Sequence, residues 1–119
     1  MALNKFGQFI RKYRIDNSLL LKNMAETLKI GSAYLSGMET GSKPIPSDMV
    51  EKISNAYKFD EKQRAELQRS VDESQSEVKV KTFNNPLNQQ VAAAFARSID
   101  SLSEEEKRQI LEILNGNTK

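Results

Sequence analysis

The sequence predicts a mainly α-helical protein, and three observations support this fold class. Apolar residues recur at intervals of three and four along most of the chain, which is the period of a helix with one buried face. Polar caps, glycines and prolines divide this pattern into seven helical segments. The 119 residues are 38% hydrophobic and 29% charged, which is typical of one small polar domain or of a small domain with an extension.

Three helices are expected before residue 41. The first has an apolar face that runs from Leu3 to Tyr13, and the polar residues 16–18 that follow can cap the second helix. The second and third helices are short, and they flank a tight turn at residues 30–31. Gly41 stands where a helix that ends in the left-handed conformation requires glycine.

Two more helices complete the first domain, which we expect to span residues 1–74. Two prolines exclude helix from the loop before Ser47, and Ser47 can cap the fourth helix. Asp60 and Gln63 have the spacing of a capping box, and they predict the start of the fifth helix.

Residues 75–119 are expected to form a C-terminal extension of one short strand and two helices. Polar and apolar residues alternate over residues 77–83, which is the period of a strand. A lone strand needs a partner for its backbone hydrogen bonds. Apolar residues four apart predict a helix over residues 87–99, and a capping box at Ser103 predicts another over residues 103–115.

The chain contains no cysteine and no histidine. These absences exclude disulfides and thiolate metal sites, and they remove the commonest general base and the commonest metal ligand. We therefore expect a binding protein that is not an enzyme and needs no cofactor or metal. The uninterrupted apolar runs are short and the N-terminus has no apolar signal-peptide core, so we expect a cytoplasmic protein without a membrane segment.

The net charge of +2 is small, but the charges are divided unevenly. Residues 1–59 contain nine Lys and Arg against five Asp and Glu, a net charge of +4. Residues 60–119 contain nine against eleven, a net charge of −2. The first half can therefore meet a polyanion such as DNA, whereas the second half suits contact with protein.

The second and third helices, with the turn at Ile30 and Gly31, have the dimensions of a helix-turn-helix motif. In that motif the first helix lies across the DNA backbone and the second enters the major groove. Ala25 is small where the two helices would approach each other closely. Six apolar residues would bury the pair against the first and fourth helices: Leu21, Met24, Leu28, Ile30, Leu35 and Met38.

Residues 6–59 resemble the Cro/repressor-type helix-turn-helix domain, also called the XRE family. The strings that match are Phe9-Ile10-Arg11-Lys12-Tyr13-Arg14, Met24-Ala25-Glu26-Thr27-Leu28-Lys29-Ile30 and Tyr34-Leu35-Ser36-Gly37-Met38-Glu39-Thr40-Gly41. They correspond to the family's arginine at the end of its first helix, its Leu-Ala-like pair in the second, and its Ile/Leu-Ser-x-x-Glu-x-Gly string in the third. The resemblance covers about half of the chain. It implies a five-helix, lambda-repressor-like DNA-binding domain.

The resemblance also implies roles for individual residues. One group would face base edges in the major groove: Gly31, Ser32, Ala33, Ser36 and Gly37. A second group would contact phosphates, together with the N–H groups at the start of the second helix: Lys22, Tyr34, Thr40 and Lys43. Core packing is an equal alternative for Tyr34. Glu39 would be structural, with Arg11 as its expected partner.

Two departures from the family pattern bear on DNA recognition. The family often has a glutamine at the start of the second helix, where this chain has Leu21. The base-facing group contains no Arg, Asn or Gln, the residues that make bidentate contacts with bases. Ala33 can contact a thymine methyl group, and Ser32 or Ser36 can donate one hydrogen bond. We therefore expect much of the specificity to come from DNA shape.

Repressors of this fold read two half-sites about 34 Å apart, so they act as dimers. We expect residues 75–119 to form a C2 homodimer, with the strand paired to the strand of the second copy. The alternative is that the two C-terminal helices fold back on their own domain. The residues expected at the dimer interface are Val78, Val80, Phe83, Leu87, Val91, Phe95, Ile110 and Leu114.

Together these observations predict a transcriptional regulator that binds double-stranded DNA sequence-specifically and joins the nucleoid when bound. The leading hypothesis is a dimeric repressor that occludes a promoter at a palindromic operator. The alternative is an antitoxin that neutralises a toxin and represses its own operon, since the acidic second half could meet a basic protein. A third hypothesis is a phage or mobile-element repressor that is controlled by a partner peptidase.

Overall fold

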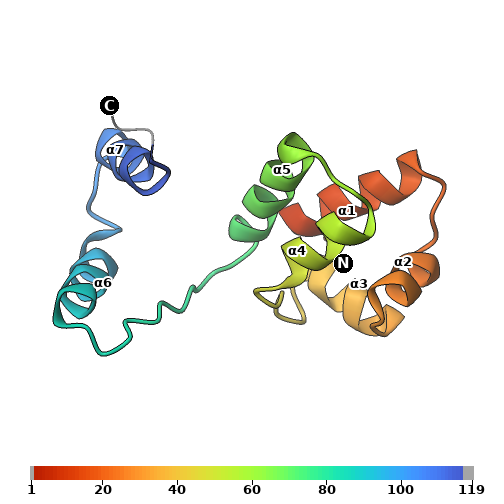
Figure 1. Cartoon of the computed structure of the whole chain (residues 1–119), viewed down its shortest axis with the longest axis horizontal. Helices are drawn as coiled ribbons and strands as arrows, with labels where there is room; N and C mark the ends of the chain where they lie inside the picture. The colour runs from red at the N-terminus through yellow and green to blue at the C-terminus, as the bar shows by residue number, and fades with distance from the viewer. Residues whose placement is uncertain (1, 117–119) are drawn as a thin grey trace. The chain divides into compact units, whose positions relative to one another are not determined.

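The computed structural model describes residues 2–116, which form seven helices in two compact units (Figure 1). The first unit ends at Val78 and the second begins at Lys79, close to the boundary predicted after residue 74. The helices are α1 (Lys5–Asp16), α2 (Leu21–Leu28), α3 (Ser32–Thr40), α4 (Met49–Ala56), α5 (Glu61–Asp72), α6 (Pro86–Ser98) and α7 (Glu104–Leu114). The prediction of a mainly α-helical fold is confirmed.

The core of the first unit lies where its five helices meet. α1 packs against α3 and α5, α2 packs against α3 and α4, and α4 packs against α5. All five helices supply apolar side chains that are withdrawn from water, which is the main force that stabilises the unit. These side chains are Phe6, Ile10, Met24, Ala25, Leu28, Leu35, Met38, Met49, Val50, Ile53, Leu67 and Val71.

An aromatic cluster closes one edge of this core. The ring of Tyr13 packs edge-to-face on Tyr57 and on Phe59, with centroids 5.3 and 5.0 Å apart, and Phe9 packs on Phe59 in the same manner. Burial raises the pKa of Tyr13, and the neighbouring Tyr57 adds to this shift. These aromatic residues therefore belong to the packing of the unit.

The ends of most helices follow the predicted chemistry. Asp60 and Gln63 form the capping box of α5, and Ser103 and Glu106 form that of α7. Gly41 ends α3 with φ of 90°, in the left-handed region that favours glycine.

Two predicted caps are wrong. α2 begins after Leu20, not after the polar residues 16–18, and the side-chain oxygen of Asn23 accepts a hydrogen bond from the Leu20 N–H at 2.9 Å. α4 begins after Asp48, one residue beyond Ser47. In both places the predicted residues are of a type that can cap a helix, but the helix begins further along the chain.

The strand predicted over residues 77–83 is wrong. No strand forms within residues 2–116, and the side chains of Val78 and Val80 are 70% and 67% exposed. A strand requires a second strand beside it to satisfy its backbone groups, and the described part of the chain offers none. Alternation of polar and apolar residues alone does not stabilise a strand.

The second unit consists of α6, α7 and the chain around them. Asn85 caps α6 by accepting a hydrogen bond from the Asn88 N–H at 3.0 Å, and Pro86 occupies the first turn. None of the residues between 79 and 116 is buried. No helix that the structure describes is both long enough and apolar enough to pass through a lipid bilayer.

Candidate nucleic-acid interface

The helix-turn-helix is formed by α2, residues 29–31 and α3. Lys29 adopts the left-handed conformation with φ of 60°, so Lys29, not Gly31, reverses the chain. The Ile30 N–H then donates to the Ala25 carbonyl at 3.0 Å, and the half-buried Ile30 side chain packs against the core. Gly31 is the N-cap of α3, with φ of −73°.

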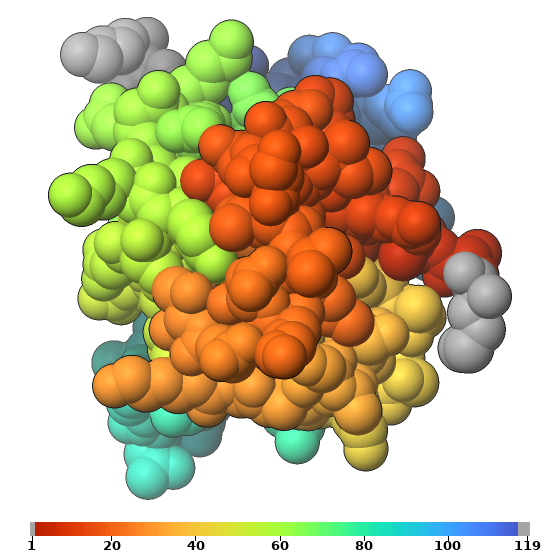
Figure 2. Space-filling model, turned by 90° about the vertical axis from the view of Figure 1, so that its right-hand side faces the viewer, coloured from red at the N-terminus to blue at the C-terminus, as the bar shows by residue number. Residues whose placement is uncertain are grey.

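The inner faces of the two helices are fixed in the core. Met24, Ala25 and Leu28 are buried on α2, and Leu35 and Met38 are buried on α3. Ala25 is 2% exposed, in keeping with the predicted close approach of the helices. Because these inner faces are anchored, the outer surface is held at a fixed orientation. Figure 2 shows the first unit from the side on which α2 lies.

The start of α3 supplies the exposed part of this surface. Gly31, Ser32 and Ala33 are exposed, and Ser36, one turn further, is half-buried. A β-carbon added at Gly31 would meet no heavy atom within 4 Å, so packing does not require a glycine there. Four of the five residues expected to face bases therefore lie at the accessible end or edge of one short helix.

Gly37 differs from the other four residues of that group because it is buried. A β-carbon at this position would collide with the side chain of Lys43, and the Lys43 N–H donates to the Gly37 carbonyl at 3.1 Å. The glycine therefore allows the loop after α3 to close over the helix. Gly37 supports the surface from beneath and does not present an edge to bases.

Two of the four expected phosphate contacts are lysines with free access to solvent. Lys22 is exposed in the first turn of α2, and Lys43 is exposed in the loop after α3. Thr40 is half-buried, and its hydroxyl donates to the Ser36 carbonyl at 3.2 Å. Tyr34 is half-buried and packs against the core, so packing occupies part of its ring.

The first turns of α2 and α3 are not capped by side chains. Leu20 and Gly31, the two N-cap residues, have no side-chain acceptor, so neither accepts a hydrogen bond from the N–H groups of the first turn. The N–H groups of a helix start need a partner, which is water or an anion when no cap is present. The N–H groups of both helix starts can therefore donate hydrogen bonds to a phosphate oxygen.

A buried ion pair holds this motif against α1. The guanidinium of Arg14 donates to both carboxylate oxygens of Glu39, and the Nη2–Oε1 distance is 3.2 Å. The prediction that Arg11 is the partner of Glu39 is wrong, and Arg11 is exposed. Phe6, Ile10 and Arg14 are spaced by four residues on the face of α1 that is buried, whereas Arg11 is rotated away from that face.

Two further residues that the sequence did not single out bring α1 close to α3. Asn4 accepts a hydrogen bond from the Gly7 N–H at 2.7 Å and donates from its side chain to the Met38 carbonyl at 2.9 Å. A β-carbon at Gly7 would collide with the backbone carbonyl of Glu39. A glycine one residue after a buried phenylalanine was the available signal for this close approach.

The residues expected at a dimer interface all lie in or beside the second unit. Most of them are exposed, and Ile110 is half-buried. They do not form a core within the described chain. Among residues 2–116, no cluster of acidic side chains has the composition of a metal site.

Comparison with known proteins agrees with this geometry. A family model described as a helix-turn-helix domain matches residues 5–67, which is more than half of the chain and includes α1, α2, α3 and α4. No curated protein matches the chain, and no solved structure matches it. The match confirms the resemblance to a helix-turn-helix DNA-binding protein. The chain belongs to the helix-turn-helix domain family, and it is in general terms a DNA-binding regulator.

Proposed function

We propose that this protein is a sequence-specific transcriptional repressor of the XRE type. Two copies would bind a palindromic operator, each with α3 in the major groove of one half-site, and would occlude the promoter. The observation that supports this function is the accessible start of α3. Gly31, Ser32 and Ala33 are exposed there, while Leu35 and Met38 anchor the same helix in the core.

The chemistry of this surface favours strong backbone contact and sparse base contact. Lys22, Lys43 and the uncapped helix starts bind phosphates and set the position of α3. Ser32 and Ser36 can each exchange a hydrogen bond with a base edge, and Ala33 fits the methyl group of thymine. The remaining specificity comes from the sequence-dependent shape of DNA, because no side chain of this group can make a bidentate contact.

Such sparse readout explains why two copies are needed. A single short helix with small side chains discriminates weakly between sequences, since each good bidentate contact contributes about 1–3 kcal/mol and none is present here. Two half-sites bound together double the number of positions that are read. The repressor therefore acts as a dimer, and the two half-sites are related by the same twofold symmetry.

Selection of bound fragments from a random pool of duplex DNA tests the proposal as a whole. The full-length protein is expected to enrich a palindrome, and the complex is expected to contain two chains per duplex. A pool that shows no enrichment would refute sequence-specific binding.

The substitution Ala33→Glu tests the position of α3. It places a carboxylate at the start of the helix, where it faces bases and phosphates, and we expect operator affinity to fall at least about 100-fold because like charges brought together cost several kcal/mol. Ala65→Glu is the matched control, because Ala65 is exposed on α5, which packs against α1 and α4. Equal affinities of the two variants in a gel-shift titration would show that α3 does not enter the groove.

The substitution Lys43→Ala tests the phosphate contacts. Removal of one such contact weakens binding to all sequences alike and reduces the slope of log K against log salt by about 0.9. Lys62→Ala, on the exposed surface of α5, should leave that slope unchanged. A sequence-dependent loss in Lys43→Ala would instead place this lysine at a base edge.

A further inference from the structure

The chain from Val78 to Leu114 exposes an unusual amount of apolar surface. In residues 2–77, only Ile15 and Leu20 are large apolar residues that stand out as exposed, whereas ten do so between residues 78 and 114, each at least 42% exposed. A soluble chain rarely leaves so many apolar side chains together in water unless another molecule covers them. The ten are Val78, Val80, Phe83, Leu87, Val91, Phe95, Ile99, Leu111, Ile113 and Leu114.

The helices of this unit are nevertheless well specified. α6 has an Asn85 cap with Pro86 in its first turn, and α7 has a complete capping box. Helices of 13 and 11 residues are marginal in water without tertiary packing. Because the unit buries no residue of its own between 79 and 116, the packing that stabilises it must come from outside the unit.

The apolar residues of α6 form a continuous ridge. Leu87, Val91, Phe95 and Ile99 follow one another at intervals of four, with the small Ala92 beside the middle of the row. Rows with this spacing on two helices interdigitate when the helices cross at about −50°. The ridge, with the small side chain of Ala92 beside it, therefore has the shape that two identical helices need in order to pack together.

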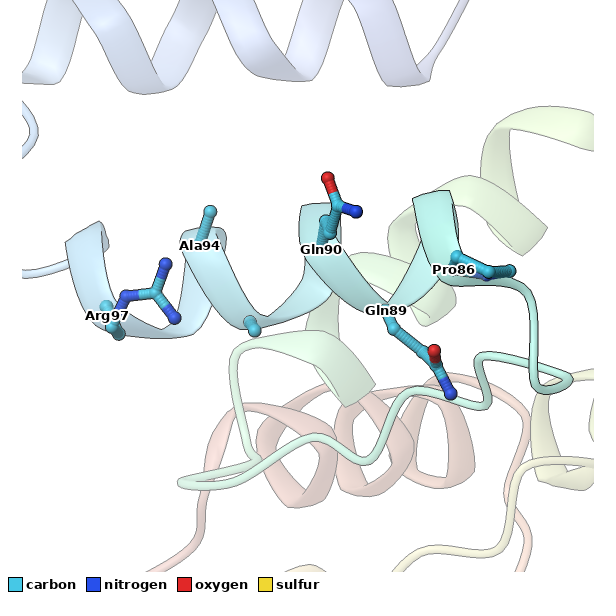
Figure 3. Close-up of a pocket in the computed structure, with 6 residues that line it drawn as sticks. Pro86, Gln89, Gln90, Ala94 and Arg97 are labelled. Carbon is cyan, nitrogen blue, oxygen red and sulfur yellow. The ribbon is translucent and has the colours of Figure 1, made fainter.

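The opposite face of α6 is polar. Gln89, Ala93 and Arg97 lie there, in a shallow hollow of about 510 Å³ that α6 alone lines (Figure 3). Arg97 is the only charged residue in α6. A second copy of α6 therefore brings no like charges together along the ridge, and a strongly charged partner would find no counter-charge on it.

We propose that α6 pairs with α6 of a second copy of this chain along the ridge Leu87–Val91–Phe95–Ile99, and that this pairing is the dimer contact of the repressor. The inference rests on the proposed function for its biological role, but it is a separate claim about association. The pairing supplies the core that the second unit lacks, so the folding of α6 is coupled to association.

The available area agrees with what a stable dimer needs. A fully exposed Val, Leu, Ile or Phe side chain presents roughly 100–200 Å² of apolar surface. At the observed exposures the four side chains of the ridge therefore present on the order of 300 Å² per chain, and all ten present on the order of 900 Å². A standard interface buries about 800 Å² on each partner, of which a little over half is non-polar. The ridge thus supplies roughly two thirds of the non-polar area of an ordinary interface, and the other exposed side chains of residues 78–114 can supply the rest.

Sedimentation equilibrium of the full-length protein without DNA tests the pairing. The wild type is expected at about twice the 13.5 kDa mass of one chain. Val91→Glu buries two carboxylates at the centre of the ridge, and we expect the dissociation constant to rise at least 100-fold, as a rough estimate from unpaired buried charge. Glu is a better helix former than Val, so helix propensity does not explain such a loss.

Ala93→Glu is the matched control, because it adds the same charge to the opposite face of the same helix and should leave the mass unchanged. A wild-type monomer, or a Val91→Glu dimer as tight as that of Ala93→Glu, would overturn the proposal. A monomer that acquires mass only with a different protein, such as a toxin, would assign the ridge to that partner and overturn it as well.

A separate signal shows whether the variants remain folded. All three tyrosines, Tyr13, Tyr34 and Tyr57, lie in the first unit, so near-ultraviolet circular dichroism reports on that unit. Val91→Glu should keep this signal while it loses the dimer. Because the mass is measured without DNA, the two results are read separately. A monomeric wild type that still enriches a palindrome would refute the pairing alone, and a dimer that enriches no sequence would refute the proposed function alone.

Discussion

The two units of this chain use the same local signals but differ in burial. α5 and α7 both begin with a complete capping box, and α1 and α6 both begin with an asparagine cap. Twelve apolar residues form a core in the first unit, whereas none is buried in the described part of the second. Caps decide where a helix starts, and burial decides whether it is stable by itself.

The largest expected effect comes from removing the partner of a buried charge in the first unit. Glu39→Ala leaves the guanidinium of Arg14 without its partner in the core of the first unit, and we expect a loss of about 3–5 kcal/mol in the free energy of unfolding. Glu112→Ala, on the exposed surface of α7, should change it by less than about 0.5 kcal/mol. Urea unfolding followed by the tyrosine signal measures both. A loss below about 1 kcal/mol for Glu39→Ala would mean that water reaches Arg14.

A single leucine can be compared in the same way in each unit. Leu67 is fully buried, and Leu67→Ala should cost about 2–5 kcal/mol because it removes apolar contact and leaves a cavity. Leu114 is 72% exposed, so Leu114→Ala should not change the unfolding of the first unit. Thermal melts at low protein concentration check this difference. Equal losses would show that the second unit contributes to the core of the first.

Two glycines of the first unit differ in how closely other atoms surround them, so their substitution by alanine should have different effects on stability. Gly7→Ala forces α1 away from the backbone of α3, and we expect a loss of about 1–3 kcal/mol in unfolding free energy. Gly31→Ala meets open space at an ordinary φ, so stability should be unchanged or slightly higher. Urea titrations give both values, and the same pair measured for DNA affinity should show the reverse order of sensitivity.

The smallest expected effect is a pH dependence in α7. The Ser103 backbone N–H, which donates to the Glu106 carboxylate at 2.9 Å, lowers the pKa of Glu106 below its ordinary value of 4.5, and the Ser103 side chain adds to this shift. A carboxylate with a lowered pKa stabilises the folded helix above the ordinary value, and this contribution is lost as the pH falls through the lowered pKa. The Cα chemical shifts of α7 should report a loss of helix below pH 4.5. Glu106→Gln should remove that step, because an amide does not titrate in this range, and a step that persists in this variant would assign it to another carboxylate.

The sequence predicted the helices of both units because their signals are local. The intervals of three and four in apolar residues and the caps at Asp60 and Ser103 act within one helix, so they could be read without tertiary structure. The strand at 77–83 failed because a strand depends on a second segment. The polar residues 16–18 failed as a cap because they end the preceding helix: α1 runs through Asp16, Asn17 is its C-cap, and Ser18 turns the chain with φ of 56°.

The sequence predicted the exposed surface of the candidate site, but it did not predict the buried contacts that hold this surface in place. The exposed start of α3 followed from the motif, and Gly31, Ser32 and Ala33 lie where it implied. The partner of Glu39 required the rotation of α1, which selects Arg14 over Arg11. The burial of Gly37 depends on a loop that returns over its own helix, which residue types alone do not reveal.

No helix occupies residues 73–85, the segment between Asp72 and Pro86. Residues 73–78 lie in the first unit, where the Ser74 hydroxyl accepts a hydrogen bond from the Phe6 N–H at 2.8 Å. Residues 79–85 of each chain can span at most roughly 25 Å when fully extended, so the two such segments of a dimer together exceed the separation of about 34 Å between adjacent half-sites. In a dimer joined through α6, this segment acts as a tether that raises the effective concentration of the second DNA-binding unit once the first has bound. The tether does not impose one distance, so the DNA itself sets the spacing, and operators whose half-sites differ by a full helical turn should compete for the same repressor.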